Sequence, residues 1–306
     1  MTRSRANALL LIAGAVWGAA FVAQSTAMDS LGPFAFIALR FALASAVIAP
    51  LAYVEAKRAD RTLAPRDHGA HALVGLALFL GMAFQQVGLL TTSVTNSGFL
   101  TGLYVVFTPL LGIAIFRQWP HRAVWPGVAL ATLGVYLLGG ASFVNLSVGD
   151  GLTLVCAMFW ALQVVLIGRF VREGNRPIGL ALTQFAVTAG LAALVSLAFE
   201  NTTFEAVLAA GPEILYAGIL GSALAFTVQV VAQRHTTAPQ AAIFLSSEAL
   251  FAALFGAMLL GERIGTIGLL GCALMFGAMV LVEIVPMLSR GRALQRDAIA
   301  PDESVT

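Results

Sequence analysis

Glu248 lies deep within a long apolar stretch of the sequence, where a carboxylate needs a specific partner. The stretch covers residues 238–260, so a helical conformation places Glu248 about ten residues, or about 15 Å, from its start. An ionised carboxylate at that depth in a bilayer costs about 2.5 to 3.5 kcal/mol on insertion scales, so it should face water, bind a cation or carry a proton. We therefore expect Glu248, with Ser247 beside it, to bind a proton or substrate. A structural carboxylate hydrogen-bonded to the hydroxyls of Ser246 and Ser247 is the alternative.

Arg40 is a second charge within an apolar stretch, seven residues into the segment 33–54. Its guanidinium cannot lose its charge, so it needs a carboxylate, backbone carbonyls or water. It could bind the carboxylate of an amino-acid-like substrate. It could equally be structural, reaching the membrane surface or bonding helix ends, and the sequence leaves both interpretations open.

Hydroxyl groups follow one face of the apolar stretch 94–115. Ser97, Thr101, Tyr104 and Thr108 are spaced four, three and four residues apart, which places them on the same side of a helix. This face could line an aqueous path, with Tyr104 near mid-depth as the best candidate. The alternative is hydrogen bonding between neighbouring helices, where hydroxyls of this kind are common.

Two Trp residues each share a helical face with a Gln. Trp17 and Gln24 are seven residues apart, and Trp160 and Gln163 are three apart. Both Trp residues fall at mid-depth, away from the interfacial belts where Trp usually anchors a helix. They could form the aromatic walls of a substrate cavity or simply pack in the core.

These residues together form the predicted substrate and proton path. No His or Cys spacing matches a metal or haem motif, so we predict neither a metal site nor a cofactor. The path comprises Glu248, Ser247, Arg40, Thr101, Tyr104, Trp17, Gln24, Trp160 and Gln163.

The composition predicts that transmembrane helices position these side chains. Hydrophobic residues make up 59% of the 306 residues and charged residues only 10%, against roughly 25% charged in soluble domains. Long continuous apolar runs are typical of helices and not of barrel strands, so we predict an all-α integral membrane protein with ten transmembrane helices in the bilayer. The ten stretches are 7–26, 33–54, 70–90, 94–115, 123–140, 149–168, 177–199, 212–233, 238–260 and 264–285.

Basic residues predict the orientation. All but two of the 17 Lys and Arg residues lie at the chain ends or in every second connection, and only Arg40 and Arg263 do not. The positive-inside rule makes those connections cytoplasmic. We therefore predict a multi-pass protein of the inner membrane with a cytoplasmic N-terminus (1–6) and a cytoplasmic tail (286–306).

The two halves of the chain repeat each other. Trp17 recurs as Trp160, and the Pro33, Arg40 and Phe41 spacing recurs as Pro177, Gln184 and Phe185, at offsets of 143 to 144 residues. Five spans in each copy, 7–140 and 149–285, give two five-helix repeats of inverted topology. A site between inverted halves can be opened to either side in turn, which is typical of transporters.

Motifs in both halves resemble a known family. The order of Trp17, Pro33, Arg40 and Phe41, then Asn96 to Leu103, Leu245 to Gly256 and Leu260 to Arg263, is similar to ten-helix permeases of the drug/metabolite transporter superfamily, EamA type. The resemblance covers residues 7–285 and implies export of amino acids and other small metabolites. One departure is Ala249, which follows Glu248 where many relatives have Pro.

We therefore predict a secondary active transporter, not an enzyme, that exports amino acids or similar small metabolites by alternating access, with proton exchange as one possible coupling. No Gly-x4-Gly-Lys-Ser/Thr string occurs, so a gradient should supply the energy. A lipophilic-cation or drug exporter is the alternative, and a membrane-embedded scaffold or enzyme is less favoured. The net charge of +2 comes from Arg residues in loops and reflects topology, so we expect no nucleic-acid partner. The expected partner is a small-molecule substrate, and the oligomeric state stays open.

Overall fold

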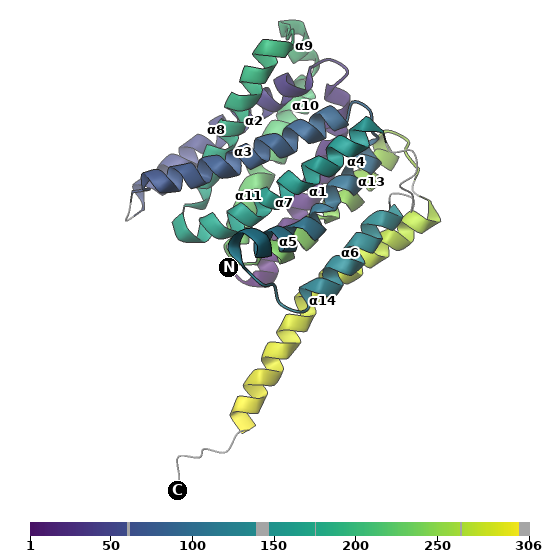
Figure 1. The fold of residues 1–306 in the computed structure, drawn as a ribbon. Helices are drawn as coiled ribbons and strands as arrows, with labels where there is room; N and C mark the ends of the chain where they lie inside the picture. Colours follow the sequence, from purple (N-terminus) through teal and green to yellow (C-terminus); the bar gives the residue numbers. More distant parts are fainter. Residues whose placement is uncertain (60–61, 139–146, 175, 264, 300–306) are drawn as a thin grey trace.

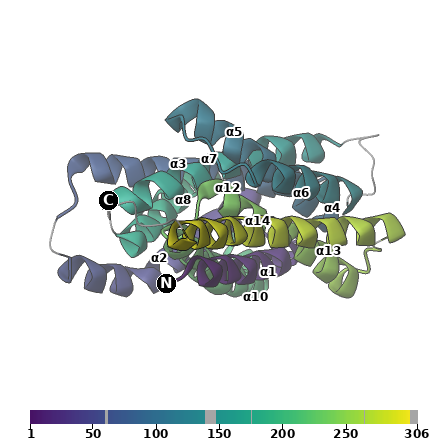
Figure 2. The same cartoon turned by 90° about the horizontal axis from the view of Figure 1, so that it is seen from below.

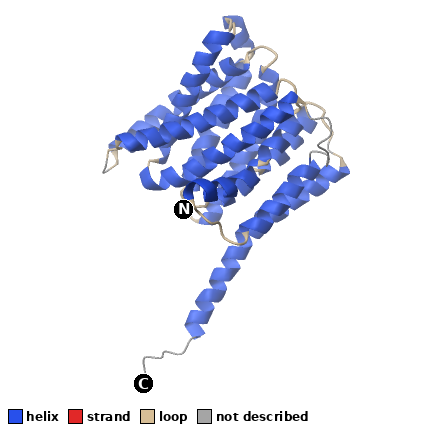
Figure 3. Ribbon diagram, in the orientation of Figure 1, coloured by secondary structure: helices blue, strands red, loops and turns tan. Residues whose placement is uncertain are grey.

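The computed structural model describes residues 1–59, 62–138, 147–174, 176–263 and 265–299, and this part of the chain contains helices and loops but no strand (Figure 3). In chain order the helices are α1 (Arg3–Ala27), α2 (Pro33–Lys57), α3 (Pro65–Gly88), α4 (Val94–Gly102), α5 (Tyr104–Phe116), α6 (Val124–Leu138), α7 (Val148–Gly174), α8 (Pro177–Phe199), α9 (Phe204–Ala209), α10 (Gly211–Leu215), the π-helix η1 (Tyr216–Leu224), α11 (Ala225–Gln233), α12 (Ala238–Leu245), α13 (Ser247–Leu259) and α14 (Thr266–Ile299).

Eight helical segments in the described ranges are long and apolar enough to cross a membrane. The apolar helices Val124–Leu137 and Thr266–Val282 are shorter. The prediction of an all-helical membrane protein is confirmed, while the number of ten spans stays a prediction. Helix α14 runs on to Ile299 and extends past the bundle (Figure 1), so it contains most of the predicted tail 286–306; residues 300–306 lie outside the described part.

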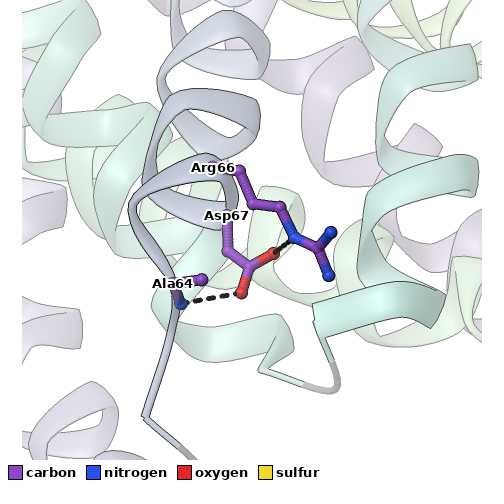
Figure 4. A network of polar contacts seen from close by, with 3 residues as sticks. All are labelled: Ala64, Arg66 and Asp67. Atoms are coloured by element: carbon purple, nitrogen blue, oxygen red, sulfur yellow. Dashed lines mark hydrogen bonds and ion pairs between the residues drawn. The ribbon is translucent and has the colours of Figure 1, made fainter.

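Polar residues extend α3 beyond its apolar stretch, as Figure 4 shows. The backbone N–H of Ala64 donates to Asp67 Oδ2 at 2.9 Å, and Pro65 occupies the first helical position, where no N–H is needed. Arg66 Nε lies 3.8 Å from Asp67 Oδ1, but the Arg66 side chain is 82% exposed, so this ion pair adds little stability. The helix therefore begins five residues before the predicted stretch 70–90.

Helices from the two halves of the chain pack against each other. Helix α2 packs on α8, α3 on α7 and on α8, and α1 on α13, while α6 and α14 form a separate pair (Figure 1). Seen from below, α1 and α10 lie at one side of the bundle and α5 at the other (Figure 2). Because most large contacts join the halves, the centre of the bundle is lined by both.

Helices α1 and α13 approach closely because α1 carries glycines at the contact. A Cβ atom at Gly18 would lie 2.3 Å from the Phe251 Cβ and 2.7 Å from the Ala252 backbone N. One turn earlier, a Cβ at Gly14 would lie 2.3 Å from the Ser247 hydroxyl oxygen. No larger residue fits here without movement, which agrees with small residues at the interfaces of membrane helices.

Carboxylates join the two halves at the ends of the helices. At the end of the bundle where α1 finishes, Glu200 accepts hydrogen bonds from the backbone N–H groups of Phe34 (3.0 Å) and Ala35 (2.7 Å). At the opposite end, Glu55 accepts from the N–H groups of Ile178 (3.1 Å) and Gly179 (2.7 Å). Helices α2 and α8 therefore cap each other's first turn, where the helix dipole favours a negative charge.

Three further carboxylates of the second half accept hydrogen bonds from the first half at the same end as Glu200. Glu262 accepts from the N–H groups of Val94 (3.2 Å) and Thr95 (3.0 Å) and from the Thr95 hydroxyl. The other two contacts are from the hydroxyl of Thr92 to Asp150 and from that of Thr26 to Glu213, the latter at 3.2 Å.

Two helices that read as continuous in the sequence are interrupted by one residue. Leu103 separates α4 from α5, and Ser246 separates α12 from α13. At each point the chain makes a tighter turn: the N–H of Val106 bonds the carbonyl of Leu103 and that of Ala249 bonds Ser246, three residues back in each case. The interruption near Leu103 lies six residues before Pro109, which is inside α5.

Candidate functional site

A small cavity lies among six helices near the middle of the bundle. Its walls come from α1, α2 and α3 of the first half and from α7, α11 and α13 of the second. The space open to the centre of a water molecule is ≈ 10 Å³, room for about one water. The lining residues are Trp17, Phe21, Gln24, Arg40, Met82, Gln85, Trp160, Phe226 and Glu248.

Glu248 is the only acidic residue on this wall, in the first turn of α13 just after the interruption at Ser246. The residue is 5% exposed, and its Oε1 atom has no hydrogen-bond partner among the described residues. Its position in the first turn gives the carboxylate the positive end of the helix dipole, which partly offsets its burial. Oε1 is therefore available to bind another group.

Arg40 reaches the same cavity from α2 and is 1% exposed, so it does not extend to the membrane surface. Its Nε atom donates to the Ser222 hydroxyl at 3.0 Å. The guanidinium also lies 5.1 Å from the centre of the Phe41 ring and 5.7 Å from that of Phe36. Its Nη1 atom has no hydrogen-bond partner in the described structure, and no Glu or Asp oxygen there lies within 4 Å of it.

Three of the four aromatic rings that line the cavity pack against one another. Trp160 and Phe226 are stacked, with centroids 5.4 Å apart and planes at 4°, and Trp17 lies 4.6 Å from Phe226 and 5.8 Å from Trp160. The indole N–H of Trp17 donates to the carbonyl of Gly221 at 2.8 Å, whereas that of Trp160 has no partner within the described residues. The repeated Trp residues thus meet each other, as do Phe41 and Phe185 at 5.8 Å.

Two amide side chains complete the wall. Gln85 Nε2 donates to the Thr101 hydroxyl at 3.1 Å, while Gln24 leaves its Oε1 atom buried without a partner in the described ranges. The neighbouring Gln86 points elsewhere and donates to the Gln24 backbone carbonyl at 2.9 Å. Only Gln85 of this adjacent pair therefore faces the cavity.

The structure brings five of the nine predicted path residues to this cavity: Glu248, Arg40, Trp17, Gln24 and Trp160. Thr101 lies behind the wall as the partner of Gln85, and Ser247 packs against Gly14. Tyr104 is 2% exposed within the hydrophobic core and does not line the cavity.

Gln163 also lies away from the cavity, in a buried cluster of glutamines. Its Nε2 donates to Gln184 Oε1 at 3.2 Å and to Gln229 Oε1 at 3.3 Å, and Gln229 donates back to Gln163 Oε1 at 3.0 Å. Gln184 is the counterpart of Arg40 in the repeat. At the position that corresponds to Arg40, the second half therefore has an amide bound within a cluster of glutamines.

The sequence did not single out Phe226 or Ser222. Phe226 is one of 20 Phe residues and has no distinctive spacing. Ser222 follows Gly221 in an apolar stretch, and the glycines at 218 and 221 were the available signal for close helix contact there.

Both halves of the chain match one protein family. The EamA-like transporter family matches residues 4–140 and again residues 147–284. The chain belongs to the EamA-like transporter family. This EamA-like protein is therefore a membrane transporter.

Relatives agree with this assignment. The EamA-like chain is 32% identical over 280 residues to an uncharacterized transporter of Archaeoglobus fulgidus, which covers 90% of this chain and 84% of the relative. A second uncharacterized transporter of the same archaeon is 27% identical over 271 residues, 85% of this chain and 91% of the relative. A crystal structure of another protein superposes with a TM-score of 0.74 and 20% identity, covering 92% of this chain and 97% of that one, which shows the shared fold.

Proposed function

We propose that this EamA-like protein is a secondary active transporter that exports amino acids or similar small metabolites by alternating access. The observation that carries the proposal is a set of four buried polar atoms around one cavity, each without a hydrogen-bond partner among the described residues. Two are donors, on Arg40 and Trp160, and two are acceptors, on Gln24 and Glu248.

Unpaired polar atoms at such density are unfavourable in a protein interior. A buried donor or acceptor without a partner costs about 1 to 3 kcal/mol, and more for a charged group. A ligand with its own donors and acceptors would remove that cost, and a zwitterion would match both Arg40 and Glu248. Rings of Trp17, Trp160 and Phe226 would then contact its apolar part.

The size of the cavity supports alternating access. Because the space holds about one water, a metabolite can enter only when helices separate on one side. Three helices of each half contribute to the walls, so a movement of one half against the other would open the cavity. The closed cavity corresponds to an occluded conformation between the two open ones.

We propose that Glu248 either binds and releases a proton during the cycle or binds the amino group of the substrate. It has no cation within 4 Å in the described structure, and it lies beside the aromatic wall where a substrate would rest. Export of a lipophilic cation would also use this carboxylate. The presence of Arg40 on the same wall disfavours that alternative, because the guanidinium is a donor for an anionic group, which a lipophilic cation lacks.

The experiment that tests the proposal compares Glu248→Gln with the native protein in proteoliposomes. Export should fall at least tenfold and lose its dependence on pH, because the amide cannot exchange a proton. The control is Glu205→Gln, which changes an exposed carboxylate in α9. An unchanged rate and an unchanged pH profile for Glu248→Gln would show that the proton role is wrong.

The substrate itself is found by comparing metabolites outside cells that express the native protein or Glu248→Gln. Accumulation of an amino acid that depends on Glu248 supports the proposal. Accumulation of a lipophilic cation instead would favour the alternative.

A further inference from the structure

A π-helix runs through the second half of the bundle beside the cavity. The segment η1 covers nine residues, Tyr216–Leu224, and packs against α1 and α2 of the first half. Helical turns of this kind are rare, and they are frequently found at functional sites. Glycines at 218 and 221 allow the contact, since a Cβ at Gly218 would lie 2.7 Å from Leu43 Cδ2.

Two consecutive residues of this π-helix hold two side chains of the cavity wall. The carbonyl of Gly221 accepts a hydrogen bond from the Trp17 indole, and the hydroxyl of Ser222 accepts one from Arg40 Nε. Arg40 and Trp17 belong to different helices of the first half. The single segment Gly221–Ser222 therefore fixes the relative position of a guanidinium and an aromatic ring.

The contact with Ser222 decides which atoms of Arg40 remain free. Nε is used at 3.0 Å, and Nη2 lies over Gly221, where even an added Cβ would be at an ordinary contact distance of 3.4 Å. Nη1 has no partner among the residues that the structure describes. A guanidinium held in this way presents a fixed N–H group with full positive charge, which suits a carboxylate better than a neutral group.

We propose that Ser222 is a positioning residue that orients Arg40 to bind the carboxylate of the transported molecule. The inference rests on the proposed function and names the part of the substrate that the cavity recognises. Ser222 does not contact the substrate; it acts through Arg40. Loss of its hydroxyl would leave the charge of Arg40 in place but would remove the acceptor that fixes the guanidinium.

The test measures binding to the purified full-length protein. The probes are the twenty common L-amino acids and, for each one that binds, the amine that lacks only its carboxylate. In Ser222→Ala the affinity for the amino acid should fall about tenfold, since a hydrogen bond to a charged group is lost. The affinity for the matching amine should stay within about twofold, because the amine does not use Arg40.

Two further variants separate positioning from a general structural effect. Ser222→Thr keeps the hydroxyl and should restore the preference for the amino acid over its amine. Ser45→Ala removes a hydroxyl from α2 that bonds the carbonyl of Phe41 in its own helix at 2.8 Å, and this preference should not change.

Each outcome has a distinct meaning. Equal weakening of amino acid and amine in Ser222→Ala, or no change in either, would overturn the positioning role while leaving the amino-acid substrate intact. If the native protein binds none of the twenty amino acids, the proposed substrate class is wrong and the carboxylate role falls with it.

Discussion

Replacing Gly18 by Ala tests the close packing of α1 on α13, which holds Trp17 and Glu248 in one wall. The added Cβ would lie 2.3 Å from the Cβ of Phe251 and 2.7 Å from two backbone atoms of α13. Backbone cannot rotate out of the way, so the two helices must separate. Overpacking of this kind costs about 1 to 3 kcal/mol.

A matched substitution isolates that packing cost. Gly190 lies on the exposed side of α8, and a Cβ there has no atom within 4 Å in the described structure. Gly→Ala in a helix interior gains about 0.5 to 1 kcal/mol through backbone entropy at either position. The difference between Gly18→Ala and Gly190→Ala therefore removes the common gain and leaves about 1 to 3 kcal/mol of packing cost.

The assay is thermal unfolding of the two purified variants in the same detergent. Gly18→Ala should unfold at a temperature several degrees lower than Gly190→Ala. Gly14→Ala should be intermediate, because its nearest clash is with the Ser247 hydroxyl, a side-chain atom that can rotate. Equal stability of Gly18→Ala and Gly190→Ala would refute the close approach of α1 and α13.

Two other predictions concern the ends of the helices. Glu262→Gln should lower the unfolding temperature by a few degrees relative to Glu205→Gln, because it weakens charge-assisted hydrogen bonds to the first turn of α4; equal melting curves would contradict the contact. Cysteines placed at Arg58 and Asn201, both exposed, should be labelled from the cytoplasmic side and the outer side respectively. Labelling of both positions from one side would exclude the predicted orientation.

The sequence predicted most helices because a long apolar run has one stable conformation in a bilayer. It did not predict the interruptions at Leu103 and Ser246, since neither position carries Gly or Pro. Pro109, the evident helix breaker, instead lies inside α5, where the Thr108 hydroxyl bonds the Tyr104 carbonyl at 2.8 Å. The helix is therefore interrupted six residues before its proline and not at it.

Charge was the most informative signal for the candidate site. Glu248 and Arg40 stood out because a charge in an apolar run needs a specific environment, and both line the cavity. Amides and hydroxyls carried less information, since Gln163 and Thr101 satisfy other buried groups. Helical spacing shows which residues share a face, but the neighbours of that face come from distant parts of the chain, as Ser222 does for Arg40.

The carboxylates that join the two halves are unevenly divided between the ends of the bundle. Glu200, Glu262, Asp150 and Glu213 accept hydrogen bonds from the first half where α1 finishes, whereas Glu55 accepts them at the other end. Separating the halves at the first end must break bonds to four carboxylates, so we expect the higher activation barrier there. If that end faces outward and the protein exports its cargo, as we propose, release of the cargo is the slow step and sets the turnover rate.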